Sequence, residues 1–114
     1  MAVWQKKSNL ELPSAESSRK FLEQFDKANF KELVHGDLRQ HNLESSSWAV
    51  CGLGLVGDNN YVPAVKAFEK AAKIEPNLKT KINFLECAQH AAILANNERK
   101  AASIAISLSK LRRQ

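Results

Sequence analysis

Small and bulky side chains recur at fixed intervals between residues 48 and 76, on two stretches with helical periodicity. The first stretch places a glycine four positions after a tryptophan, so that another helix can cross closely at the glycine. The second places small and aromatic residues at steps of four and three, which brings them onto one helical face. This pattern predicts a tightly packed pair of helices. The residues in register are Trp48, Gly52, Tyr61, Ala64, Phe68, Ala71 and Pro76.

Turn residues divide the rest of the chain into further helices. Ser14 is a good N-cap for a first helix, and a second is expected from about Asn29. Any hydroxyl of Ser45, Ser46 or Ser47 could cap the helix that holds Trp48. The clearest helix runs from residue 62 to 75 and is stopped by Pro76. Two more are expected over residues 79–95 and 98–111.

The same turn chemistry occurs twice. A shift of 37 residues carries Asn59-Asn60 onto Asn96-Asn97, and it also aligns the helices on either side of each pair. A recurrence of this length is typical of helical repeats, in which each hairpin buries its apolar face against a neighbour.

This register resembles that of tetratricopeptide repeats, strongly over residues 45–78 and more weakly over residues 79–114. The resemblance implies an all-α fold, a short α-solenoid of about three stacked hairpins over residues 14–44, 45–78 and 79–112. It also implies one domain over residues 14–114, preceded by a flexible arm of residues 1–13.

In this family the first helix of each unit lines a groove that receives a peptide or partner helix. The resemblance therefore implies a non-catalytic interaction module such as a scaffold, adaptor or small chaperone. Its apolar lining suits an amphipathic helix or an apolar peptide, although the N-terminal arm or a second copy of the chain could cover it equally well. The groove positions carried over are Ala49, Leu53, Val56, Asn83, Glu86, His90 and Ile93.

An alternative function follows from the charge. The net charge is +5, and residues 79–114 hold seven Lys or Arg against two Asp or Glu, whereas residues 1–78 are balanced. Such a field favours nucleic acid or another polyanion, although a terminal repeat also needs a solvated outer face. The residues expected to carry this alternative are Arg99, Lys100, Lys110, Arg112 and Arg113.

The sequence gives no credible catalytic set, cofactor site or metal site. Residues 52–57 read G-x-G-x-x-G, but the segment from Asp58 to Pro63 prevents the helix that a dinucleotide site needs after its third glycine. Cys87 and His90 could supply only half of a zinc site.

The two cysteines, Cys51 and Cys87, are too few for a disulfide framework and are expected to be buried free thiols. No apolar run reaches the roughly 18 residues of a membrane helix, and no secretory signal is recognised, so we expect a cytoplasmic protein.

Overall fold

The computed structural model describes residues 12–25 and 43–114, and within them it contains helices and no strand. The all-α class is therefore confirmed for this part of the chain. The expected helix from Asn29 lies outside the described residues, as does most of the arm of residues 1–13. The described helices are α2 (Ala15–Glu23), α3 (Leu43–Gly57), α4 (Tyr61–Ile74), α5 (Leu78–Leu94) and α6 (Glu98–Arg112).

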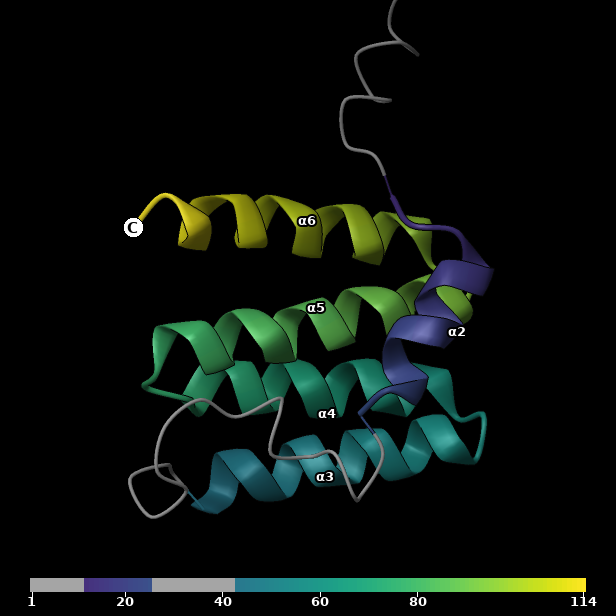
Figure 1. Ribbon diagram of the computed structural model, residues 1–114, viewed down its shortest axis with the longest axis horizontal. Coiled ribbons are helices and arrows are strands. Elements are labelled where there is room, and N and C mark those ends of the chain that lie inside the picture. The colour runs from purple at the N-terminus through teal and green to yellow at the C-terminus, as the bar shows by residue number, and fades with distance from the viewer. Residues whose placement is uncertain (1–11, 26–42) are drawn as a thin grey trace, which may run out of the picture.

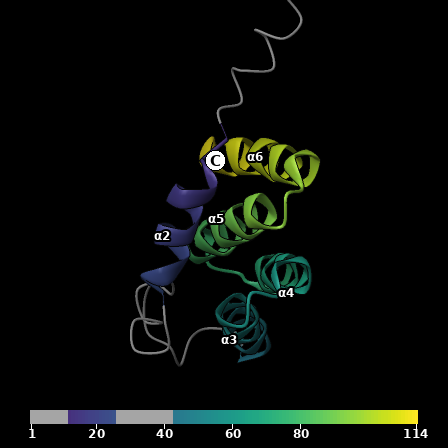
Figure 2. The same cartoon turned by 90° about the vertical axis from the view of Figure 1, so that its right-hand side faces the viewer.

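Each of the helices α3 to α5 packs against the next one along the chain, and the two run in opposite directions (Figure 1). Seen from the side, they zigzag between two layers: α3 and α5 form one layer, and α4 and α6 form the other (Figure 2). Helix α2 lies outside the α3 and α5 layer and makes its main contact with α5. If the hairpins stacked in chain order, α2 would make its main contact with α3. The observed position of α2 therefore differs from the one expected for the first hairpin.

Side-chain caps fix most of the helix starts. Ser14, as predicted, accepts a hydrogen bond from the Ser17 amide at 3.1 Å, and Asn77 and Asn97 cap α5 and α6 in the same manner. The prediction that a serine caps α3 is wrong, because α3 already begins at Leu43. Ser45 is buried, and its hydroxyl lies 2.9 Å from the Ala71 carbonyl oxygen of α4. It therefore joins two helices.

The two Asn-Asn turns have the same geometry. Asn59 and Asn96 adopt the left-handed conformation, with φ of 63° and 59°. The amides of Asn60 and Asn97 donate to carbonyls five residues earlier, at 2.8 and 2.9 Å. This is the Schellman arrangement, which satisfies the last carbonyls of α3 and α5. Asparagine suits the position because it tolerates the left-handed region better than most residues.

The predicted contact between Gly52 and α4 is present. A Cβ atom placed on Gly52 would lie 2.8 Å from Cε1 of Phe68, closer than side chains pack. Phe68, Ala64 and Ala71 are completely buried. Trp48 and Tyr61 are half-buried, and Pro76 is exposed. The Lys70 ammonium lies 5.3 Å from the centroid of the Trp48 ring. The tetratricopeptide assignment itself stays a prediction.

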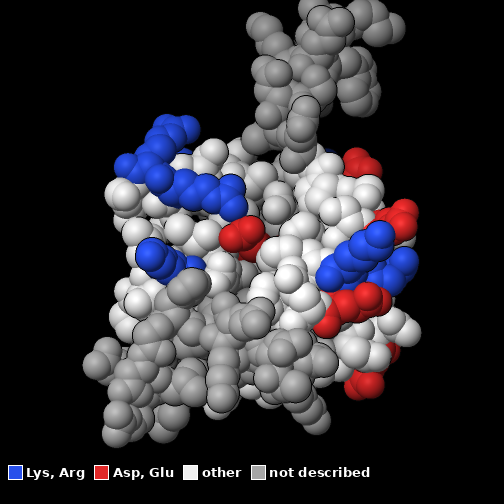
Figure 3. All heavy atoms as spheres, viewed as in Figure 1, with Lys and Arg blue, Asp and Glu red and all other residues white. Residues whose placement is uncertain are grey.

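Charged side chains are distributed unevenly along the helix axes. On the face seen in Figure 3, Lys and Arg gather where α6 ends, and both signs of charge mix at the opposite end. Because neighbouring helices are antiparallel, the C-terminal ends of α4 and α6 lie at the same end of the molecule as the start of α5.

Gly52 and Gly54 offer a matched pair of substitutions. Gly52→Ala should destabilise the protein by about 1–3 kcal/mol, because the methyl group collides with a fully buried ring. Gly54→Ala should stabilise it by roughly 0.5–1 kcal/mol, since nothing lies near its Cβ position and alanine is the better helix former. Urea unfolding measures both values. Equal effects of the two substitutions would contradict the close approach of α3 and α4.

Candidate functional site

The outer surface of the α3 and α5 layer, hereafter the α3–α5 face, receives helix α2. Ser18 of α2 is completely buried, and its hydroxyl lies 2.9 Å from Nδ1 of His90 on α5. Phe21 stacks on the His90 ring with 4.1 Å between centroids, and it meets Phe25 edge-on at 5.1 Å. Leu22 is also buried. Ser18, Phe21, Leu22 and Phe25 are three, one and three positions apart, so they lie on one face of α2 and of the residues just after it.

Burial changes the chemistry of His90. Loss of solvation lowers the pKa of its imidazole from 6.5 to about 4, so the ring is neutral near pH 7. A neutral ring can share a hydrogen bond with the Ser18 hydroxyl and stack on Phe21 without burying a charge. His90 therefore acts here as a packing and hydrogen-bonding residue of the α2–α5 contact.

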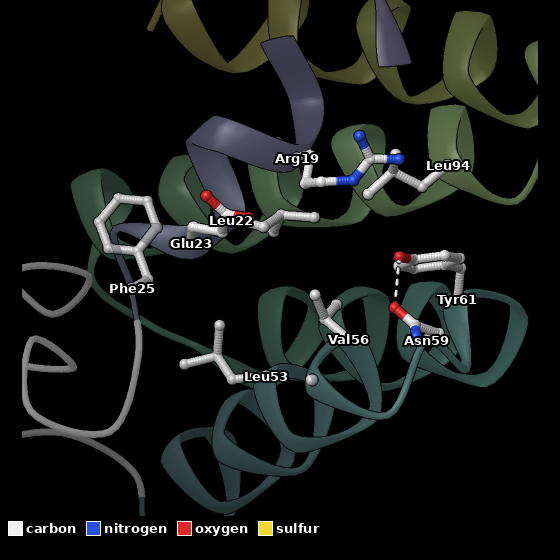
Figure 4. A pocket seen from close by; sticks show the side chains of 10 residues that line it. Arg19, Leu22, Glu23, Phe25, Leu53, Val56, Asn59, Tyr61 and Leu94 are labelled. Carbon is white, nitrogen blue, oxygen red and sulfur yellow. Dashed lines mark hydrogen bonds between the residues drawn. The ribbon is translucent and has the colours of Figure 1, made fainter. Parts of the chain in front are cut away.

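A groove of about 320 Å³ remains beside α2, between it and α3 (Figure 4). Its apolar lining comes from α2, α3 and α5. Its polar rim includes the Tyr61 hydroxyl, which donates to Oδ1 of Asn59 at 2.8 Å. Figure 4 shows Leu53 and Val56 of α3 facing α2 across this space. The residues that line the groove are Arg19, Leu22, Glu23, Phe25, Leu53, Val56, Gly57, Asn59, Tyr61 and Leu94.

The seven predicted groove residues do not form one continuous surface. Leu53 and Val56 line the groove. His90 and Ile93 are each 9% exposed, and His90 is in contact with α2. Ala49 is completely buried and belongs to the core, so its prediction as a binding residue is wrong.

Asn83 and Glu86, the other two predicted residues, lie among half-buried positions of α5 and do not line the groove. Glu86 instead meets Arg112 of α6 at 3.5 Å. Burial raises the pKa of its carboxyl, and the charge and hydrogen bond of Arg112 act in the opposite direction.

Sequence reasoning missed the contribution of α2 to the site. Arg19, Leu22, Glu23 and Phe25 supply one whole wall of the groove. The helical spacing of Phe21, Leu22 and Phe25 indicates that α2 needs an apolar neighbour, but spacing alone does not identify which helix that neighbour is.

The five predicted polyanion-binding residues divide into two groups. Arg99 and Lys100 lie in the first turn of α6, where the Lys100 ammonium pairs with Glu69 at 2.9 Å. Lys110, Arg112 and Arg113 lie at the other end of the helix, about 16 Å away along its axis. These residues therefore do not form a single stripe.

The cysteine prediction is half right. Cys87 is buried, and burial together with the nearby Glu86 charge raises the pKa of its thiol. Cys51, which was also expected to be buried, is exposed. Across residues 12–25 and 43–114 no cluster of three or more His, Cys, Asp or Glu could hold a metal ion. None of the helices described there combines the length and the apolar character that crossing a bilayer requires.

Comparison with known proteins gives no relative: no family model, curated protein or solved structure matches this chain.

The buried His90 predicts a specific pH dependence. Its folded-state pKa lies below the ordinary value, so its contribution to stability is complete above pH 6.5 and is lost as the pH falls toward 4. The free energy of unfolding should fall by up to roughly 3 kcal/mol through this window. Urea unfolding at intervals of pH measures the slope.

His90→Gln is the control, because it retains hydrogen bonding toward Ser18 but cannot titrate in this range. The difference in stability between the wild type and this variant should change steeply between pH 6.5 and 4. Parallel curves for the two proteins would show that His90 is not buried as described.

Proposed function

We propose that this protein is a non-catalytic interaction module whose groove between α2, α3 and α5 binds an apolar segment of a partner protein. The chemistry of the groove supports this. The half-buried Leu53, Val56 and Leu94 offer apolar surface to the ligand, and the buried Leu22 and Phe25 form the α2 side of the groove. The charged and hydroxyl groups at the rim can fix the orientation of a peptide, as in ligand sites generally.

One observation carries the proposal: the α3–α5 face already holds an amphipathic helix. Ser18, Phe21, Leu22 and Phe25 anchor α2 with the spacing by which a helix is recognised in a groove. The groove continues this apolar surface beyond the edge of α2. A partner that lies beside α2 would therefore use the same kind of contact as α2 itself.

The size of the groove suggests how much of the partner enters. Ligand sites commonly occupy about 300–1,000 Å³, and this groove falls at the lower limit. It has room for a few side chains from one face of a helix or an extended peptide. The rest of the partner would lie across the outside of α2 and α3.

The tetratricopeptide resemblance supports the same proposal. In that family the groove is lined by the helices that correspond to α3 and α5, and a scaffold, adaptor or small chaperone would use it for protein partners. The two unpaired cysteines suit the reducing environment of the proposed cytoplasmic location.

Selection of peptides from a random display library against the intact protein tests the proposal. The enriched peptides should carry large apolar residues at helical or alternating spacing. Leu53→Asp places a carboxylate in the groove and should weaken binding of a selected peptide by about tenfold or more. Isothermal titration calorimetry measures the affinity.

Ile106→Asp is the matched control, since it introduces the same charge at an exposed position on α6. Circular dichroism of both variants confirms that they are folded. Equal affinity of the two variants for every enriched peptide would refute groove binding, and so would a library that yields no apolar peptide.

A further inference from the structure

A second surface gathers basic side chains from three helices. Lys73 lies in the last turn of α4, Lys79 and Lys81 in the first turn of α5, and Lys110 and Arg113 at the end of α6. Lys81 is half-buried, and the other four are exposed. We call these five residues the basic end. They lie at the same end of the molecule because the helices that carry them alternate in direction (Figure 1).

Among the residues that the structure describes, little negative charge opposes the basic end. Within the described residues, none of its five cations pairs with a carboxylate. Glu86 is engaged by Arg112 at 3.5 Å. Glu75 is 1% exposed, and its oxygens accept from the Asn77 amide at 3.0 Å and lie 3.2 Å from the Ser45 hydroxyl. Glu44 at the start of α3 also lies near this end, and its side chain is exposed.

The opposite end of the same helices differs. Asp58 follows the end of α3 there, and Glu98 and Arg99 begin α6. Glu69 of α4 pairs with Lys100 at 2.9 Å. Figure 3 shows this contrast on one face, with blue side chains at one end and both colours at the other. The excess of positive charge is therefore a local property of the basic end.

We propose that the basic end binds the phosphate backbone of double-stranded nucleic acid without reading its sequence. A backbone ligand fits because the cations come from three helix ends, whereas sequence readout usually needs one helix or ribbon that enters a groove. Each ammonium or guanidinium that neutralises a phosphate releases a counterion, and this supplies the affinity.

Two other acidic partners fit less well. A membrane surface usually takes up the apolar face of a helix, but α4, α5 and α6 use their apolar faces in the core of the protein. A single strand usually stacks its bases on exposed aromatic rings. The described aromatic residues nearest this end, Trp48 and Phe84, are half-buried and fully buried.

Fluorescence anisotropy with a labelled duplex of about 20 base pairs tests the proposal on the intact protein. Between about 50 and about 200 mM salt, five phosphate contacts should weaken binding by about 10²- to 10³-fold. The double variant Lys110→Glu with Arg113→Glu should weaken binding by about tenfold or more and reduce the salt slope by about two.

The matched control is Lys66→Glu with Arg99→Glu, which makes the same change in net charge at exposed positions away from the basic end. It should retain most of the affinity and the salt slope. Equal losses in the two double variants would overturn the proposal, because binding would then follow net charge alone.

Two further probes decide the kind of partner. The duplex should bind at least as tightly as one of its single strands, and DNA and RNA duplexes should bind within a few-fold of each other. Tighter binding to phosphatidylserine vesicles than to the duplex, retained at high salt, would assign this end to a membrane and overturn the proposal.

Discussion

The close approach of α3 to α4 at Gly52 is the constraint on which the rest of the structure depends. Phe68 fills the space that a side chain at position 52 would occupy, and it is completely buried there. Buried alanines of α4 leave room for α5 to pack on it as well, and α3 and α5 share one layer. The α3–α5 face exists because these two contacts place α3 and α5 on the same side of α4. A larger residue at position 52 would move α3 outward and change both the face and the groove.

Helix α2 divides that face into a covered part and an open part. Over the covered part, the hydrogen bond between Ser18 and His90 and the stacked Phe21 ring offset the loss of solvation of His90. The open part lies beside Leu53 and Val56, near the end of α3, whereas the basic end lies where α6 finishes. The two proposed binding surfaces are therefore at different ends of the helices, and a peptide in the groove would leave the basic end accessible.

Local features were predictable from the sequence, and contacts between distant segments were not. The Asn59 and Asn96 turns, the extent of α4 and the Gly52 contact follow from spacing over a few residues. The docking of Ser18 on His90 joins positions 72 residues apart, and no local pattern specifies it. Cys51 was wrongly predicted to be buried because α3 carries apolar residues all round. Periodicity therefore does not indicate which side of α3 is buried. The polyanion-binding residues were expected on α6 alone. The antiparallel packing brings the end of α6 and the start of α5 to the same end of the molecule, so basic residues of both helices gather there.

The central claim is that α2 lies on the α3–α5 face, because without it the groove loses one wall. Nuclear Overhauser effects between the ring protons of Phe21 and His90 test this contact directly at neutral pH. With 4.1 Å between the ring centroids, we predict strong cross-peaks and ring-current shifts for both residues. Random-coil chemical shifts for residues 15–23, with no cross-peak between these two rings, would contradict the account.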